Sequence, residues 1–139
     1  MSEPVSTRLT FASLTAVVIT AFTLAATTVS ASPASISGKW HGSGVVKLKE
    51  GGQETVRCRV TYGRIAGQDF SLNARCASGA GRLNQSGKLT RVATNKYVGN
   101  VTSNEYSVSA RVAITVNGGF QHVTISSDQG SANLRLARR

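Results

Sequence analysis

The chain has 139 residues, and its 16 Lys and Arg outnumber six Asp and Glu to give a formal net charge of +10. A chain of this length has room for one small domain with one core. Two histidines and two cysteines provide no cluster with the spacing of a zinc site, so we expect neither a metal nor a cofactor.

An uncharged stretch, Leu9 to Gly38, precedes fifteen of the 16 Lys and Arg. Its first part, Leu9–Val29, is apolar, and Val29-Ser30-Ala31 then has small residues at both specificity positions of a signal-peptidase site. We therefore predict a signal peptide over residues 1–31, cleavage before Ser32, and a domain over 32–139 released into the periplasm or the medium. The alternative is an uncleaved leader that anchors the protein in the inner membrane, because the run is long enough to span a bilayer.

Turn signals rich in Gly, Asn and Asp divide the rest of the chain into segments in which apolar and polar residues alternate. Alternation with period two is typical of strands, and short connections favour antiparallel hairpins. The fold class we predict is all-β, an eight-stranded antiparallel up-and-down barrel, because closure removes exposed edges. A two-sheet β-sandwich is the alternative. The predicted strands are 36–49, 53–62, 69–77, 81–91, 96–102, 106–116, 120–126 and 131–136.

Parity assigns the side chains of each strand to one of two faces. On the first strand, two glycines share the inward face with Trp40, and we expect them to permit sharp coiling and to leave space against the ring. On the sixth strand the inward residues are Tyr106, Val108, Ala110, Val112, Ile114 and Val116.

The two cysteines lie on the apolar faces of the second and third strands. An even number of cysteines in an exported protein favours a disulfide, here Cys58–Cys76. If they pair directly, the hairpin is centred on Gly67, inside a turn predicted independently from its glycines. The agreement of turn, alternation and cysteines supports this register. The alternative is a pair of metal-binding thiols.

Gly38-Lys39-Trp40, at the start of the first strand, resembles the Gly-x-Trp signature of the calycins: lipocalins, avidins and small bacterial barrel inhibitors of metalloproteases. The resemblance implies that Trp40 closes one end of a barrel core. The inhibitor family also carries one disulfide, which Cys58 and Cys76 would match. The segment Gly38–Gly44 followed by two cysteines is similar to exported alphaproteobacterial proteins of unassigned role.

The chemistry-bearing residues do not form the pattern of an enzyme. His41 is expected on the polar face of the first strand, and no nucleophile-elbow motif or isolated carboxylate pair is present. We therefore expect a non-catalytic protein.

The basic excess is the main functional signal. In the cysteine register Arg59 stands opposite Arg75 on the outer face, where like charges repel. Arg57, Arg82 and Lys88 extend the pair into a candidate anion-binding surface. An anionic envelope component or an acidic protein would relieve the repulsion.

Other partners fit the sequence less well. Nucleic acid is not expected, because the compartment is wrong and outward stacking aromatics are lacking. The mature form should have no membrane span, since its outward residues are polar. We expect a monomer whose interior is filled by Val, Leu, Ala, Tyr and Trp. The alternatives are a calycin-like protease inhibitor and a small-ligand carrier that uses the barrel interior.

Overall fold

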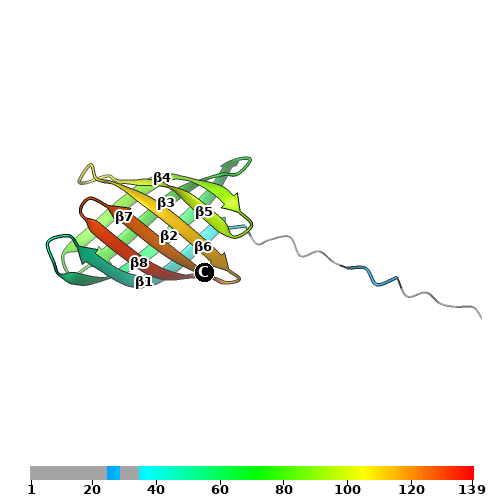
Figure 1. The fold of residues 1–139 in the computed structure, drawn as a ribbon, viewed down its shortest axis with the longest axis horizontal. Helices are drawn as coiled ribbons and strands as arrows, with labels where there is room; N and C mark the ends of the chain where they lie inside the picture. Colours follow the sequence, from blue (N-terminus) through cyan, green and yellow to red (C-terminus); the bar gives the residue numbers. More distant parts are fainter. Residues whose placement is uncertain (1–24, 29–34) are drawn as a thin grey trace, which may run out of the picture. The chain divides into compact units, whose positions relative to one another are not determined.

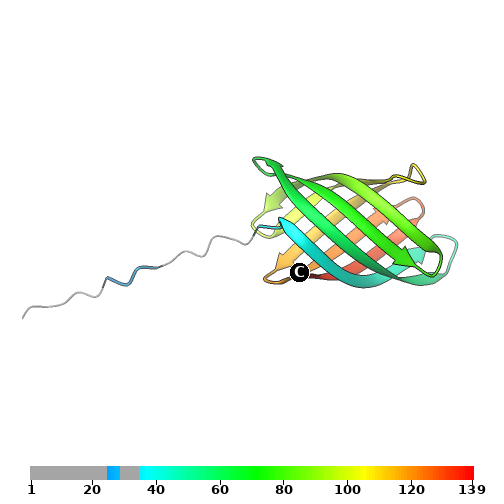
Figure 2. The same cartoon turned by 180° about the vertical axis from the view of Figure 1, so that it is seen from behind.

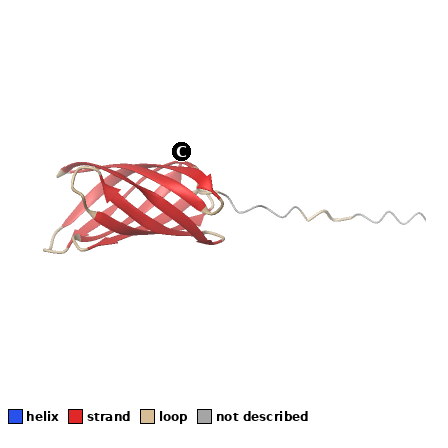
Figure 3. Ribbon diagram, turned by 90° about the horizontal axis from the view of Figure 1, so that it is seen from above, coloured by secondary structure: helices blue, strands red, loops and turns tan. Residues whose placement is uncertain are grey.

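The computed structural model describes residues 25–28 and 35–139, and within these residues all regular structure is β-strand (Figure 3). The predicted cleavage site and most of the predicted leader lie outside this part of the chain. Among the described residues, none forms a helix with the length and apolar character needed to cross a membrane. The eight strands are β1 (Gly38–Leu48), β2 (Gln53–Ala66), β3 (Asp69–Ser78), β4 (Gly81–Ala93), β5 (Lys96–Ser103), β6 (Ser109–Asn117), β7 (Phe120–Ser127) and β8 (Gly130–Arg138).

The strands form a closed barrel in which each pairs antiparallel with the next and β8 returns to pair with β1. Figures 1 and 2 show the tilted strands on the two sides of this barrel. The up-and-down barrel is therefore confirmed, and the β-sandwich alternative is wrong. The reason is the β1–β8 ladder, which runs from Trp40↔Arg138 to Leu48↔Gly130 and leaves no open edge.

Most predicted strand limits agree with the structure within two residues, and two differ more. β2 continues to Ala66, because the turn is made by Gly67 and Gln68, and the extra residue forms a bulge between Arg64 and Ala66. β6 begins at Ser109 rather than at residue 106, because Ser107 adopts a left-handed backbone conformation with φ of 52°.

The two ends of the barrel differ in their connections. We call the end with the turns at 67–68, 94–95 and 118–119 the closed end; β1 begins and β8 finishes there, as the C-terminal label in Figure 1 shows. The open end carries the connections 49–52, 79–80, 104–108 and 128–129. Alternation along each strand points one set of side chains into the barrel, and this set forms the core.

Inward glycines allow two opposite strand pairs to coil closely. A Cβ added to Gly44 of β1 would lie 2.0 Å from the backbone oxygen of Asn133 on β8. A Cβ added to Gly42 would lie equally close to the backbone oxygen of Arg135. On the other side of the barrel, Gly87 of β4 would similarly meet a backbone oxygen of β5. The sharp coiling expected from the glycines of the first strand agrees with this geometry. The space they provide, however, is for the backbone of β8 and not for the Trp40 ring.

Candidate functional site

Large side chains fill the closed end. Trp40 is 1% exposed, and its indole Nε1 donates a hydrogen bond of 2.8 Å to the carbonyl oxygen of Ile36. The Arg138 guanidinium lies 4.3 Å from the centre of the indole ring and donates to the carbonyls of Ser35 and Ser37. Trp40 thus lies where the calycin resemblance implies, in the core at one end, with a cation covering its face.

The remaining plug combines aromatic rings with one buried polar pair. Phe70 and Tyr97 pack edge to face with ring centres 5.3 Å apart. The Tyr62 hydroxyl donates a 2.8 Å hydrogen bond to Gln121 Oε1, and burial raises the pKa of this phenol above its ordinary value. Both members are buried, so the Tyr62 phenol stays neutral at physiological pH and holds the amide in place. Among the residues that the structure describes, these side chains fill the interior of the closed end.

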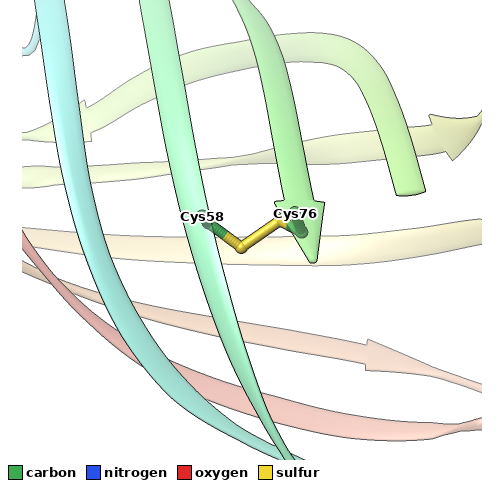
Figure 4. The surroundings of a disulfide bond; sticks show 2 residues. All are labelled: Cys58 and Cys76. Carbon is green, nitrogen blue, oxygen red and sulfur yellow. A yellow bond between two sulfur atoms is a disulfide. The ribbon is translucent and has the colours of Figure 1, made fainter. Parts of the chain in front are cut away.

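The disulfide lies midway along the barrel wall. Cys58 and Cys76 are joined and face each other directly across β2 and β3 (Figure 4). The same ladder pairs Val60 with Ala74, which confirms the register predicted from the sequence. Cys58 is buried and Cys76 packs against the core, so the bond is part of the interior wall. A pair of metal-binding thiols is excluded because both sulfurs are in the bond.

The open half of the interior contains a cavity of about 390 Å³. By contrast, the cavity deeper in the barrel, beside the disulfide, measures about 20 Å³. The expectation of a filled interior is therefore wrong for this half. The cause is side-chain size, because the inward positions here carry small or aliphatic residues. The wall is mainly aliphatic, and its apolar residues include Val46, Leu48, Val56, Leu83, Ala110, Ile125, Ala132 and Leu134.

Polar groups lie at the floor and at the rim of this cavity. The Gln85 side chain lines both the small and the large cavity and so stands at the border between them. Ser103 also lines the large cavity and accepts a hydrogen bond from the Tyr106 backbone N–H. At the mouth, Ser78 donates to the Glu54 carboxylate. The cavity therefore offers an apolar body with a few hydrogen-bonding groups, which is the usual composition of a small-molecule site.

Tyr106 does not occupy the core position that parity assigned to it. It lies in the 104–108 connection, is 68% exposed and borders the mouth of the cavity. The connection folds back onto β4, where the Asn84 side-chain amide donates a 2.7 Å bond to Glu105. This bond lowers the pKa of the Glu105 carboxyl below its ordinary value. The hydrogen bond between Glu105 and Asn84 therefore tethers the segment that carries Tyr106 to β4.

The outer wall places four of the five predicted anion-binding residues together. Arg59 is directly opposite Arg75, as predicted, and Arg57 lies one row nearer the open end. Arg57 faces Ala77, and Ala77 faces Arg82 on β4, so Arg82 completes the group. We call Arg57, Arg59, Arg75 and Arg82 the arginine belt. In the same row across β1, Ser43 separates Arg57 from Arg135 of β8, which the sequence interpretation had not included.

Lys88 stands apart from the arginine belt. It lies six residues from Arg82 along β4, about 20 Å away at the usual rise of a strand, and its ammonium is 3.7 Å from Asp69. The carboxylate of Glu105 is bonded to Asn84, the residue opposite Arg75. Some negative charge therefore borders one side of the belt.

Sequence reasoning missed the cavity, although a signal for it was present. The bulky inward residues occupy the beginning of odd-numbered strands and the end of even-numbered ones, as Trp40, Tyr62, Phe70, Leu89 and Tyr97 show. In an up-and-down barrel those positions all lie at one end. Comparing inward side-chain volumes between the two halves of each strand would have indicated the hollow end.

Comparison with known proteins identifies the fold and no family. No family model matches the chain, and no curated protein matches it. Among solved structures, a redesigned β-barrel named mFAP0, bound to DFHBI, is 16% identical, has a TM-score of 0.63, and covers 73% of this chain and 97% of its own. A de novo designed fluorescence-activating β-barrel is 14% identical with a TM-score of 0.59 and covers 74% of this chain and 93% of its own. The fold is therefore similar to that of ligand-binding barrels.

Proposed function

We propose that this protein is a non-catalytic barrel that binds a small, mainly apolar molecule in its open half. The observation that carries the proposal is the 390 Å³ cavity, whose volume lies within the range of ordinary ligand sites. Its wall is apolar, and it opens at one end of a barrel whose other end is plugged. The similar barrel mFAP0, which is described as bound to DFHBI, lends support to this use of the interior.

The position of the polar groups supports binding without chemistry. The residues lining the cavity include no histidine, and their one charged member is Arg82; the Glu54 carboxylate lies at the mouth, and both histidines are on outward positions. Gln85 at the floor and Ser103 on the wall can each hydrogen-bond a neutral oxygen or nitrogen. The ligand class that fits is an uncharged or weakly polar molecule that buries most of its surface.

The test uses N-phenyl-1-naphthylamine, a neutral apolar fluorophore that the basic surface does not attract. We expect its emission to rise on binding to the processed protein with micromolar affinity. Ala110→Phe places a ring in the cavity and should weaken binding at least tenfold. Ala113→Phe is the matched control, because Ala113 lies on the same strand but faces outward, and it should leave binding unchanged. Absence of binding to the wild type, or equal binding by both folded variants, would refute the proposal.

A second candidate function is binding of an anionic envelope component or an acidic protein through the arginine belt. The direct opposition of Arg59 and Arg75 favours it, since such a pair repels unless a partner neutralises it. Replacing both residues with Gln should leave the barrel folded and change its stability by only a few tenths of a kcal/mol. Capture of an envelope partner should weaken, and the remaining binding should depend less on salt. Unchanged capture would mean that these arginines serve solubility alone.

A further inference from the structure

The charges of the barrel are distributed unequally between its two ends. Four of the five acidic residues in the barrel, Glu50, Glu54, Glu105 and Asp128, lie in or beside the connections of the open end. The fifth, Asp69, is at the closed end and is engaged by Lys88. Six basic residues occupy the closed end: Lys39, Arg64, Arg91, Lys96, Arg138 and Arg139. This end therefore carries almost all of its charge with one sign.

Exposed apolar side chains accompany these cations. Ile65 and Val92 are 56% and 57% exposed, and each is the extra residue of a bulge beside a closed-end turn. Each also directly follows an arginine, Arg64 or Arg91. A large apolar side chain that is left in water next to a cation gains nothing for the fold, because the barrel core is complete without it. Val98 and Phe120 are also exposed near this end.

We propose that the closed end is a membrane-docking surface that binds the anionic face of a lipid bilayer. The cations meet lipid phosphates, and Ile65 and Val92 enter the headgroup region as two shallow apolar contacts. A bilayer fits better than a soluble acidic protein because the apolar residues are separate points on different turns and form no groove. Basic residues near an anionic bilayer each add to binding, whereas at the open end Lys47, Lys49 and Arg82 are offset by the four acidic residues. The cavity mouth then faces the aqueous side.

Vesicle sedimentation tests the docking surface and its orientation. The probe is vesicles of phosphatidylglycerol and phosphatidylethanolamine, with phosphatidylcholine vesicles as the uncharged comparison. Arg64→Gln with Lys96→Gln removes two closed-end cations and should weaken binding about 30-fold. Lys47→Gln with Lys49→Gln removes the same charge from the open end and should weaken it much less. Ile65→Ser with Val92→Ser should weaken binding several-fold, against little change for Leu48→Ser at the open end.

Trp40 provides an independent readout, because it is the only tryptophan and lies at the closed end. Lipids brominated near the headgroup end of their acyl chains should quench its emission in anionic vesicles. Three results would overturn the proposal: no binding to anionic vesicles at low salt, equal losses from the two charge pairs, or bound protein with unquenched Trp40. Ligand binding in the cavity is measured separately with the neutral fluorophore, so the two proposals fail independently.

Discussion

The two halves of the barrel share one backbone architecture and differ in what fills them. In the closed half, Trp40, Tyr62, Phe70 and Tyr97 occupy the interior so fully that the nearest void is about 20 Å³. In the open half, small and aliphatic inward residues leave about 390 Å³. The same strands and the same ladder thus produce a packed core at one end and a ligand-sized cavity at the other.

This difference shows how a small barrel can combine stability with a binding site. A cavity costs stability because its walls lose contacts. The barrel offsets that loss with the aromatic plug at one end and the Cys58–Cys76 bond midway along the wall. We therefore expect substitutions in the closed half to affect mainly the free energy of unfolding, and substitutions in the open half to affect mainly ligand binding.

The largest expected effect is at the plug. Trp40→Ala removes a fully buried ring, its hydrogen bond to Ile36 and its contact with Arg138, and should lower the free energy of unfolding by about 3–5 kcal/mol. Leu83→Ala in the cavity wall should cost only about 1 kcal/mol, because that side chain is already partly exposed. Denaturant unfolding of both variants makes the comparison. Equal losses in the free energy of unfolding would mean that the two halves of the barrel contribute equally to its stability.

The disulfide comes next. Replacing Cys58 and Cys76 together with Ala should lower the free energy of unfolding by about 3 kcal/mol, since the bond closes a loop with a sequence separation of 18. Amide hydrogen exchange locates the effect. We expect protection to fall more around Ser78 and Leu83, which border the cavity, than around Leu72 and Leu89 in the plug. Uniform loss of protection would show that the halves unfold as one unit.

A glycine substitution tests the closure of β1 on β8. Gly44→Ala places a Cβ 2.0 Å from a backbone oxygen of β8 and should lower the free energy of unfolding by about 1–3 kcal/mol. Gly79→Ala is the matched control, because no heavy atom lies within 4 Å of its added Cβ. Thermal melts of the two variants provide the measurement. Tolerance at Gly44 would contradict the close approach of the two strands.

The smallest effect concerns the tether of the 104–108 connection. Because the folded pKa of Glu105 is lowered, its bond to Asn84 stabilises the connection above the ordinary glutamate value of 4.5 and is lost as pH falls through the folded pKa. The side-chain amide resonance of Asn84 should therefore titrate with a midpoint below 4.5. Asn84→Ala should return the Glu105 titration to its ordinary range. A Glu105 midpoint unchanged by this substitution would exclude the tether.

The local sequence determined much of the fold. Alternation identified the inward face of each strand, glycine-rich turns separated the strands, and the Cys58–Cys76 pair selected the register of β2 and β3. These features depend on neighbours in the chain or on one hairpin, so they can be predicted from a single sequence. The exceptions, the bulge before Ala66 and the late start of β6, arise where backbone geometry breaks the alternation.

The tertiary structure alone decided which inward residues share a level of the barrel. Trp40 and Arg138 come from opposite ends of the domain and meet at the closed end because β8 closes onto β1. Closure likewise brings the small residues of the open half around one cavity and places Ile65 and Val92 on the same end as six cations. Alternation determines the face of a side chain, but its depth depends on the register of every strand pair around the barrel.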